Sequence, residues 1–480
     1  MNFLYSKITH HKKLILIVFL CLLHGYNLFE PPLEVQPLPQ TWRAQIARNM
    51  VRNNFNMLLP EIDSTGSSPG YVRSEFQLYT FLVAILYYFF GTHIFLGRCV
   101  SIIFYIISVI ILYKLIKHIE NKSVAYCSIV VYLLIPLNYI FSQTFLPDPT
   151  MNSLALLSLY SFIVYVDNML DSNKWQWLVV FFITFTCTML IKMYMIFLLI
   201  PMYYYLFSSI KIKNHYYKIT LLIIISILIN LTWYIYAEYI GRKYIHNSWT
   251  SPMYWFNYKL LFSPSFYIDM LNRFVFQIFT PIGLSLFILA FLQRKYKVNT
   301  FFIFWLIAFF IFFIVCLNGN YINAYYQLTL TPIISFFIAV AWLSIRPTLK
   351  NSTFQKMLLT ALLIMLVFIP IIPHFKIPKS KKEMVQSAKI LTKQVPEDAY
   401  IITFHGTQLF LYFFDRKGWD INISNGLFNV ETINKILKYK SLGAEFLIFE
   451  SQEQLESFTK YLNDYQLVNK IGKYCLIKLK

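Results

Sequence analysis

Long apolar segments recur through the first 375 residues of the chain, separated by short polar turns. Each is close to the ~20 residues that an α-helix needs to cross a bilayer. The apolar run at 77–91 is shorter and contains Gln77, so it predicts an interfacial or re-entrant helix instead. The pattern predicts about eleven transmembrane helices, at 14–29, 96–116, 124–142, 151–167, 175–191, 193–210, 219–238, 274–293, 299–317, 326–345 and 357–374.

Residues 376–480 change to shorter, alternating segments and carry more charge. Their pattern predicts helices at 381–394, 408–414, 431–438 and 452–463, interleaved with strands at 399–404, 421–424, 445–450 and 473–479. Such alternation is typical of a small α/β domain. We therefore expect an all-α polytopic membrane domain at 1–375, with a first loop at 30–95, followed by an α/β domain at 376–480.

Basic residues set the expected orientation in the membrane. Lysine and arginine cluster in the loops near 114–122, 211–218, 294–297 and 346–356, whereas the turns at 143–150 and 318–325 contain neither. Because positive charge marks cytoplasmic loops, the N-terminus is expected in the cytoplasm, and the first loop and the C-terminal domain outside. The first segment predicts an uncleaved anchor in a multi-pass protein of the cytoplasmic (inner) membrane. These loops also account for much of the net charge of +20, and no nucleic-acid module is evident.

The first loop is rich in acids. It contains Glu30, Glu34, Glu61, Asp63 and Glu75. Because an ionised carboxylate in hydrocarbon costs several kcal/mol, this loop is expected to lie in water or to line a polar cavity. That placement suggests chemistry at a membrane surface.

A helix is predicted within this loop, over residues 41–54. Its apolar face consists of Trp42, Ile46, Met50 and Val51. Arg48 and Arg52 lie one turn apart on another face and could hold lipid phosphates at the headgroup layer. Simple anchoring at the surface is the alternative.

Several short motifs carry a family resemblance. They are Trp42-Arg43-x-x-Ile46-Ala47-Arg48-Asn49-Met50, Leu59-Pro60-Glu61-Ile62-Asp63, Gly70-Tyr71-Val72-x-x-Glu75-Phe76-x-Leu78-Tyr79, Phe90-Gly91, Gly97-Arg98, Leu146-Pro147-Asp148-Pro149, Lys192 and Tyr325-Tyr326-Gln327-Leu328. Together with the helices and the outer C-terminal domain, they resemble bacterial GT-C glycosyltransferases, relatives of the protein O-mannosyltransferases and of the lipid A aminoarabinose transferase (glycosyltransferase family 39-like).

The resemblance implies transfer of a sugar from a polyprenyl-phosphate donor to a lipid, glycan or protein acceptor at the outer face of the membrane. The lipid tail would lie between helices, cations would hold the phosphate, and a carboxylate would take the proton of the acceptor hydroxyl. Direct displacement by that hydroxyl would invert the anomeric centre. No glycine-rich nucleotide-binding loop is present in the sequence, which agrees with a lipid-linked donor.

The catalytic carboxylate is left open among three residues. Family members usually carry an aspartate beside the Trp-Arg helix, whereas the segment 37–41 contains no acid here. The nearest upstream acid, Glu34, is therefore the first candidate, with a solvated loop glutamate as the alternative. Glu75 and Asp148 could act instead, orient the acceptor, fix a cation, or cap helices.

Cations and aromatic rings provide candidates for substrate binding. Lys192 lies at the outer end of a predicted span, where it could bind phosphate or extend towards the headgroups. The other candidates are Arg43, Arg48, Arg242, Lys243 and Arg273 for phosphate, and Tyr325 and Tyr326 for sugar.

Glu61 and Asp63 are weak candidates for a divalent cation, and Asp63-Ser-Thr-Gly66 fits a turn equally well. The sequence requires no cofactor.

Two other functions remain possible from the sequence. A flippase or transporter of lipid-linked glycans would favour charged or broken segments within the spans, and few are evident. A surface-polysaccharide ligase or polymerase would be expected to carry its large loop late in the chain, whereas the acids here lie early.

Overall fold

The computed structural model describes residues 14–168, 175–209, 216–244, 255–293, 298–348, 365, 367, 369–404, 408–423, 428–461 and 465–479. The chain forms two compact units. The helical unit comprises Met1–Glu30, Phe95–Ile235 and Thr250–Phe375, and the loop–sheet unit comprises Pro31–Ile94, Tyr236–Trp249 and Lys376–Lys480. The first loop and the C-terminal domain therefore belong to one unit, although more than 280 residues separate them in sequence.

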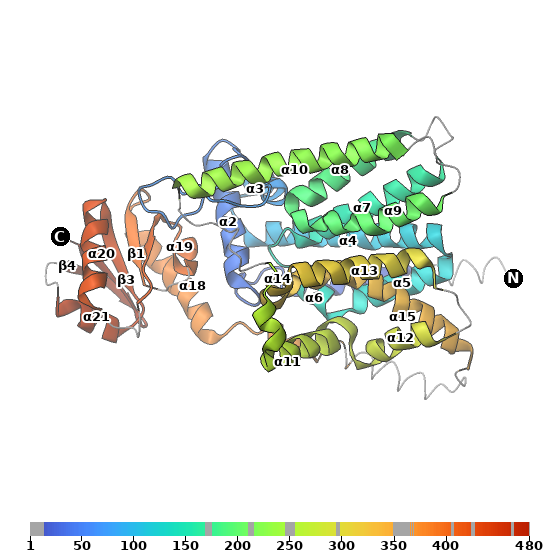
Figure 1. The fold of residues 1–480 in the computed structure, drawn as a ribbon. Coiled ribbons are helices and arrows are strands. Elements are labelled where there is room, and N and C mark those ends of the chain that lie inside the picture. Colours follow the sequence, from blue (N-terminus) through green and yellow to red (C-terminus); the bar gives the residue numbers. More distant parts are fainter. Residues whose placement is uncertain are drawn as a thin grey trace. The chain divides into compact units, whose positions relative to one another are not determined.

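The helical unit is built mainly from apolar helices, and within it α7 runs alongside α8 and α5 alongside α15 (Figure 1). Its elements are α4 (Ile94–Ile119), α5 (Lys122–Leu134), α6 (Pro136–Phe141), α7 (Asp148–Asp167), α8 (Trp175–Ile191), η2 (Met193–Leu198), α9 (Leu199–Ser208), α10 (Tyr216–Tyr244), η5 (Tyr258–Phe262), α11 (Pro264–Asn272), the π-helix η6 (Arg273–Phe279), α12 (Pro281–Leu292), α13 (Thr300–Val315), α14 (Leu317–Ile322), η7 (Ala324–Leu330), α15 (Thr331–Ile345), η8 (Arg346–Thr348) and α17 (Ile372–Phe375). The last residues of α10, from Tyr236 on, belong to the loop–sheet unit.

Fewer long spans are found than the sequence predicts. Among the described residues, four helices are long and apolar enough to cross a membrane: Ile94–Ile119, Asp148–Asp167, Tyr216–Tyr244 and Ala324–Ile345. The pair Pro264–Phe279 and Pro281–Leu292, bent by 86°, would make a fifth.

The predicted count of about eleven is not reached because the other apolar helices among the described residues have only 10–17 residues. Pro136 separates α5 from α6, since proline cannot continue the helical hydrogen bonding. Most of the predicted span at 357–374 lies outside the described residues.

Helix α3 (Leu78–Phe90) corresponds to the short apolar run in the first loop and belongs to the loop–sheet unit. Its 13 residues extend only ~20 Å at 1.5 Å per residue, less than the ~30 Å of a hydrocarbon core. It ends at Gly91, whose φ of 81° suits a residue without a side chain. This length agrees with the predicted interfacial or re-entrant helix and not with a full span.

Helix α2 (Pro37–Arg52) differs from the surface helix expected over 41–54. The apolar side chains of Ile46 and Met50 pack with Ile62, Val72 and Ala84, as an apolar face should. Most of the polar side is buried as well, from Gln40 to Asn49, while Arg52 stays half exposed. The expected surface helix is therefore largely covered, and polar groups such as those of Arg48 and Asn49 find partners in the protein instead of water.

The C-terminal part is a five-stranded sheet of order β2-β1-β3-β5-β4. Strands β1, β2 and β3 are parallel, and β5 pairs antiparallel with β3 and β4. The elements are α18 (Lys379–Leu391), η9 (Thr392–Gln394), β1 (Tyr400–Thr403), α19 (Leu409–Phe414), β2 (Gly418–Asp420), α20 (Val430–Ser441), β3 (Ala444–Phe449), α21 (Gln452–Thr459), β4 (Tyr465–Ile471) and β5 (Tyr474–Leu479).

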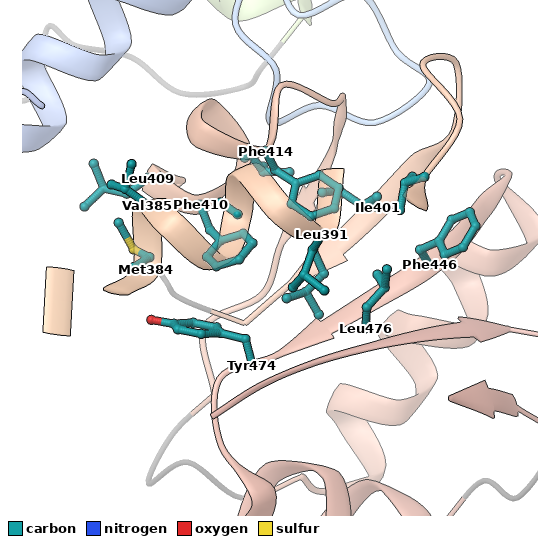
Figure 2. Close-up of a cluster of buried hydrophobic side chains, with 14 of the residues drawn as sticks. Met384, Val385, Leu391, Ile401, Leu409, Phe410, Phe414, Phe446, Tyr474 and Leu476 are labelled. Atoms are coloured by element: carbon teal, nitrogen blue, oxygen red, sulfur yellow. The ribbon is translucent and has the colours of Figure 1, made fainter. Parts of the chain in front are cut away.

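Helices cover both faces of this sheet (Figure 1). On one face, α18 and α19 pack against β1, β3 and β5 through side chains such as Leu391, Phe410 and Phe446 (Figure 2). On the other face, α20 and α21 contribute Ile436 and Phe458. The predicted α/β domain is thus confirmed, except that β4 was missed and the predicted strand at 421–424 lies at Gly418–Asp420.

Candidate active site

Helix α4 packs closely against the buried turn that precedes α7. Gly97 lies against the Phe145 ring, so that a Cβ atom at Gly97 would overlap it. Fully buried Arg98 donates from Nη1 to the carbonyl oxygen of Gln143 at 3.1 Å. Ser101 Oγ donates to the carbonyl oxygen of Thr144 at 2.7 Å. The Gly97-Arg98 motif therefore holds the turn that leads to Asp148.

Asp148 is the first residue of α7 and is fully buried. The cap position is Pro147, and no side chain caps this described N-terminus, so the alternative that Asp148 caps the helix does not apply. A carboxylate in the first turn is stabilised by the helix dipole. The carboxylate of Asp148 lies within electrostatic range of Tyr194. A buried acid held in this way has the character of a functional group.

Lys192 occupies the break between α8 and η2. Its backbone is extended, with φ −145° and ψ 104°, and the residue is only 8% exposed. The ammonium nitrogen lies 5.6 Å from the ring centre of Tyr326 and 5.8 Å from that of Tyr325, within cation–π range. Three predicted binding residues are therefore brought together. A lysine that extended towards the headgroups would be largely exposed, whereas Lys192 is nearly buried.

Tyr194 completes this cluster, which we call the Lys192 cluster (Asp148, Lys192, Tyr194, Tyr325 and Tyr326). The rings of Tyr194 and Tyr326 are 4.8 Å apart. Tyr194 was not predicted from the sequence, although its position two residues after Lys192 was an available signal. The cluster combines one carboxylate, one cation and three phenol rings within the helical unit.

Arg273, at the start of η6, secures the segment that precedes the two tyrosines. Its Nη1 donates to the carbonyl oxygen of Asn320 at 2.8 Å, and its Nη2 donates to that of Tyr321 at 3.0 Å. It also lines a cavity of about 630 Å³ together with Asp269, Asn272, Phe276, Gln277 and Tyr321. Arg273 thus has a structural role and borders a space that could hold a ligand.

Arg43 and Glu75 form an ion pair in the loop–sheet unit, with Nη2 and Oε1 2.6 Å apart. Arg43 also donates to the carbonyl oxygen of Pro39 at 2.9 Å. The sequence predicted both residues for the site but not their pairing. The carboxylate of Glu75 is thus already engaged by an internal cation.

Glu34 is held close to the C-terminal core. Its two carboxylate oxygens are buried, and the preceding Leu33 is fully buried in the apolar cluster formed by α18, α19 and the sheet. Lys381 Nζ donates to the Leu33 carbonyl oxygen at 3.4 Å. Glu34 is therefore not an ordinary solvated loop glutamate.

Arg48 has acidic partners on two segments. It pairs with the buried carboxylate of Asp63 and, at 2.8 Å, with Asp415. Burial alone would lower the pKa of Arg48, but these two carboxylates raise it, so that the guanidinium stays charged. The predicted use of Arg48 for a substrate phosphate competes with these internal partners.

The acids suggested for a metal are both occupied by donors. Glu61 pairs with Lys417, and Asn49 Nδ2 donates to Asp63 Oδ1 at 2.7 Å. No group of three or more potential ligands from His, Cys, Asp and Glu occurs among the residues that the structure describes. The geometry of Glu61 and Asp63 is that of internal pairing.

Arg242 and Lys243 lie at the C-terminal end of α10. Arg242 Nε donates to Glu238 at 2.9 Å, and Glu238 also pairs with Arg73 of the first loop. The ammonium of Lys243 lies 5.2 Å from the Tyr244 ring centre. Both residues stay candidates for phosphate binding.

Comparison with known proteins gives the fold a name. Residues 77–233, about a third of the chain, match the family model described as dolichyl-phosphate-mannose-protein mannosyltransferase. ArnT from Cupriavidus metallidurans, solved in its apo state, matches with a TM-score of 0.69 and 12% identity over 98% of each chain. The chain has the GT-C fold. This confirms the resemblance that the sequence motifs indicated.

Further GT-C structures agree with this assignment. ArnT bound to undecaprenyl phosphate matches with a TM-score of 0.65 and 11% identity over 97% of each chain. The archaeal oligosaccharyltransferase AglB from Archaeoglobus fulgidus, in complex with an inhibitory peptide and a dolichol-phosphate, gives 0.58 and 11% over 97% of this chain and 74% of its own. No curated protein sequence matches the chain significantly.

Proposed function

We propose that this chain is a membrane glycosyltransferase that moves a sugar from a polyprenyl phosphate to a lipid, glycan or protein acceptor. The observation that carries the proposal is the Lys192 cluster: a buried carboxylate and a nearly buried lysine among three tyrosines, in a chain with the GT-C fold. Burying these charges is costly, which a structural role alone would not explain.

The reaction needs a proton acceptor beside the incoming hydroxyl. The carboxylate takes the hydroxyl proton while the oxygen forms a bond to the anomeric carbon and the carbon–oxygen bond to phosphate breaks. The polyprenyl phosphate leaves with the electron pair, and the anomeric centre inverts. Glu34 and Asp148 are the candidates for this base, and Glu75 ranks behind them because Arg43 holds it.

Cations stabilise the phosphate as its negative charge grows. Lys192 is our first choice, because its amine is held beside the tyrosine rings and not exposed. Arg273 faces a cavity and could provide a second cation for the phosphate. Further candidates are Arg43, Arg48, Arg242 and Lys243. Tyr325 and Tyr326 can donate hydrogen bonds or offer a face to the sugar.

Two similar structures support a lipid-linked donor, because they hold undecaprenyl phosphate and dolichol-phosphate. The apolar helices make the chain a multi-pass membrane protein. We place it in the cytoplasmic membrane with its N-terminus inside and its C-terminal domain outside, following the distribution of basic residues.

Mass spectrometry of lipid-linked sugars and surface glycans, in cells with and without this protein, tests the proposal. We expect cells without the protein to accumulate a polyprenyl-phosphate sugar and to make a glycan that lacks the same sugar. An intact lipid-linked oligosaccharide that builds up on the inner face would instead favour a flippase. Unchanged lipids and glycans would contradict both.

A further inference from the structure

The first loop is hydrogen-bonded to the edge of the C-terminal sheet. Strand β2 lies at the end of the strand order, so one of its sides has no neighbouring strand within the sheet. There the Gly418 amide donates to the carbonyl oxygen of Asp63 at 2.9 Å, and the Gly66 amide donates to that of Gly418 at 2.7 Å. The turn from Asp63 to Gly66 thus covers the open side of β2 by pairing with both backbone groups of Gly418.

The fit at this edge requires a glycine. Gly66 has φ +60°, a conformation that other residues adopt at a cost, and a Cβ atom there would overlap the Trp419 ring. Trp419 is in turn stacked on Tyr439, with ring centres 4.8 Å apart. The loop and the sheet are therefore in direct contact at one defined position.

Ion pairs next to β2 also join the first loop to the C-terminal domain. Asp415, which precedes β2, pairs with Arg48 at 2.8 Å and with Arg52 at 3.0 Å. Lys417 pairs with Glu61, the residue two positions before Asp63. Because Arg48 also holds Asp63, the ion pairs link α2, the acidic segment and the sheet edge into one network.

A second attachment lies next to the candidate base. Leu33 enters the apolar cluster of α18 and α19, whose labelled members include Met384, Leu409 and Phe410 (Figure 2). Leu33 is fully buried there, so the C-terminal domain also restrains the backbone of the adjacent residue, Glu34.

We propose that the C-terminal α/β domain positions the acidic first loop, with Asp415 and Lys417 as its positioning residues. The domain acts on transfer through the loop that it holds, and neither residue contacts substrate. The kinetic part of this inference rests on the proposed glycosyltransferase function, whereas the structural part does not.

Asp415→Asn tests the inference with little other disturbance. Asp415 has φ +53°, which asparagine tolerates, so the substitution removes the charge and keeps the backbone. The matched control is Asp398→Asn, at an exposed turn of the same domain. Hydrogen exchange of the full-length protein in detergent should show amides at 62–66 exchanging about tenfold faster in Asp415→Asn only. Equal exchange in the wild type and both variants would overturn the proposal.

Transfer kinetics provide the second measurement. Lys417→Met should lower kcat several-fold with little change in the donor KM or in the unfolding temperature, and Lys417→Arg should restore kcat because it keeps the charge. A loss that tracks the unfolding temperature, or one that Lys417→Arg shares, would reduce the contact to a structural one and overturn the positioning role. If the wild type transfers no sugar from any polyprenyl phosphate while exchange responds as expected, the proposed function fails and the loop–sheet contact stands.

Discussion

Several charged side chains of this protein are buried, and they fall into two groups. Lys192, Asp148 and Arg98 are all nearly or fully buried in the helical unit, and Arg48 and Asp63 are buried in the loop–sheet unit. The two groups differ in their surroundings. Arg48 and Asp63 neutralise each other, whereas Lys192 lies against the faces of tyrosine rings. We therefore assign a structural role to Arg48 and Asp63 and propose a functional one for Lys192.

The Arg48–Asp63 pair allows a clear prediction about stability. Arg48→Met leaves the Asp63 carboxylate buried without its cation, so we expect a loss of about 3–5 kcal/mol. Arg52→Met is the control, because Arg52 binds the same Asp415 but is 49% exposed, and it should cost less than ~1 kcal/mol. Thermal unfolding of both purified variants measures the difference, and equal losses would contradict the structural role of Arg48.

At the residue scale, the sequence predicted which side chains are important better than what they do. Lys192, Tyr325 and Tyr326 were named and are brought together. The pairing of Arg43 with Glu75, 32 residues apart, depends on how the loop folds, which local patterns do not encode. The partners Asp415 and Lys417 lie even further along the chain and had no local signal.

At the scale of elements, two residues of the proposed site lie where one helix ends and the next begins. Lys192 lies between α8 and η2, and Asp148 follows a turn that α4 holds through Gly97 and Arg98. A continuous apolar helix would satisfy its own backbone and leave no room for a polar turn.

The contact between α4 and the turn before α7 allows a prediction for Gly97→Ala, which adds one methyl group. Alanine normally favours a helix over glycine by about 1 kcal/mol, but Gly97→Ala would push against the buried Phe145 ring. We expect it to destabilise the protein by about 1–3 kcal/mol and to lower transfer by moving Asp148.

Gly25→Ala is the control for this substitution, because its Cβ atom would make only an ordinary contact. It should leave both the unfolding temperature and transfer near wild-type values. A Gly97→Ala protein that is as stable and as active as Gly25→Ala would show that the turn is not held in this way.

The elements with a regular hydrophobic pattern were predicted from the sequence, whereas the exposed edge strand β4 was not. The C-terminal helices and the strands β1, β3 and β5 follow the hydrophobic pattern closely. Strand β4 was missed because its sequence, Tyr465-Gln-Leu-Val-Asn-Lys-Ile471, lies at an edge with much of it exposed and carries little alternation. Helix α2 was found, but its burial was not predicted, because its polar residues have partners far away in sequence.

At the scale of the whole molecule, the motifs of the first loop and the long apolar segments together indicated the GT-C fold, which the structural comparisons confirm. The division into units could not be predicted from the sequence. The acidic loop shares a unit with the C-terminal domain and not with the helices that flank it. Ion pairs and backbone hydrogen bonds between distant segments produce that division.

The most direct test of the account is sugar transfer by purified protein in which Glu34, Glu75 and Asp148 are all neutralised, as Gln, Gln and Asn. The donor is the polyprenyl-phosphate sugar that accumulates in cells without the protein. Loss of the proton acceptor should lower kcat by a factor of about 10²–10⁴, while the protein stays folded and binds polyprenyl phosphate. Full transfer activity in this triple variant would contradict the account.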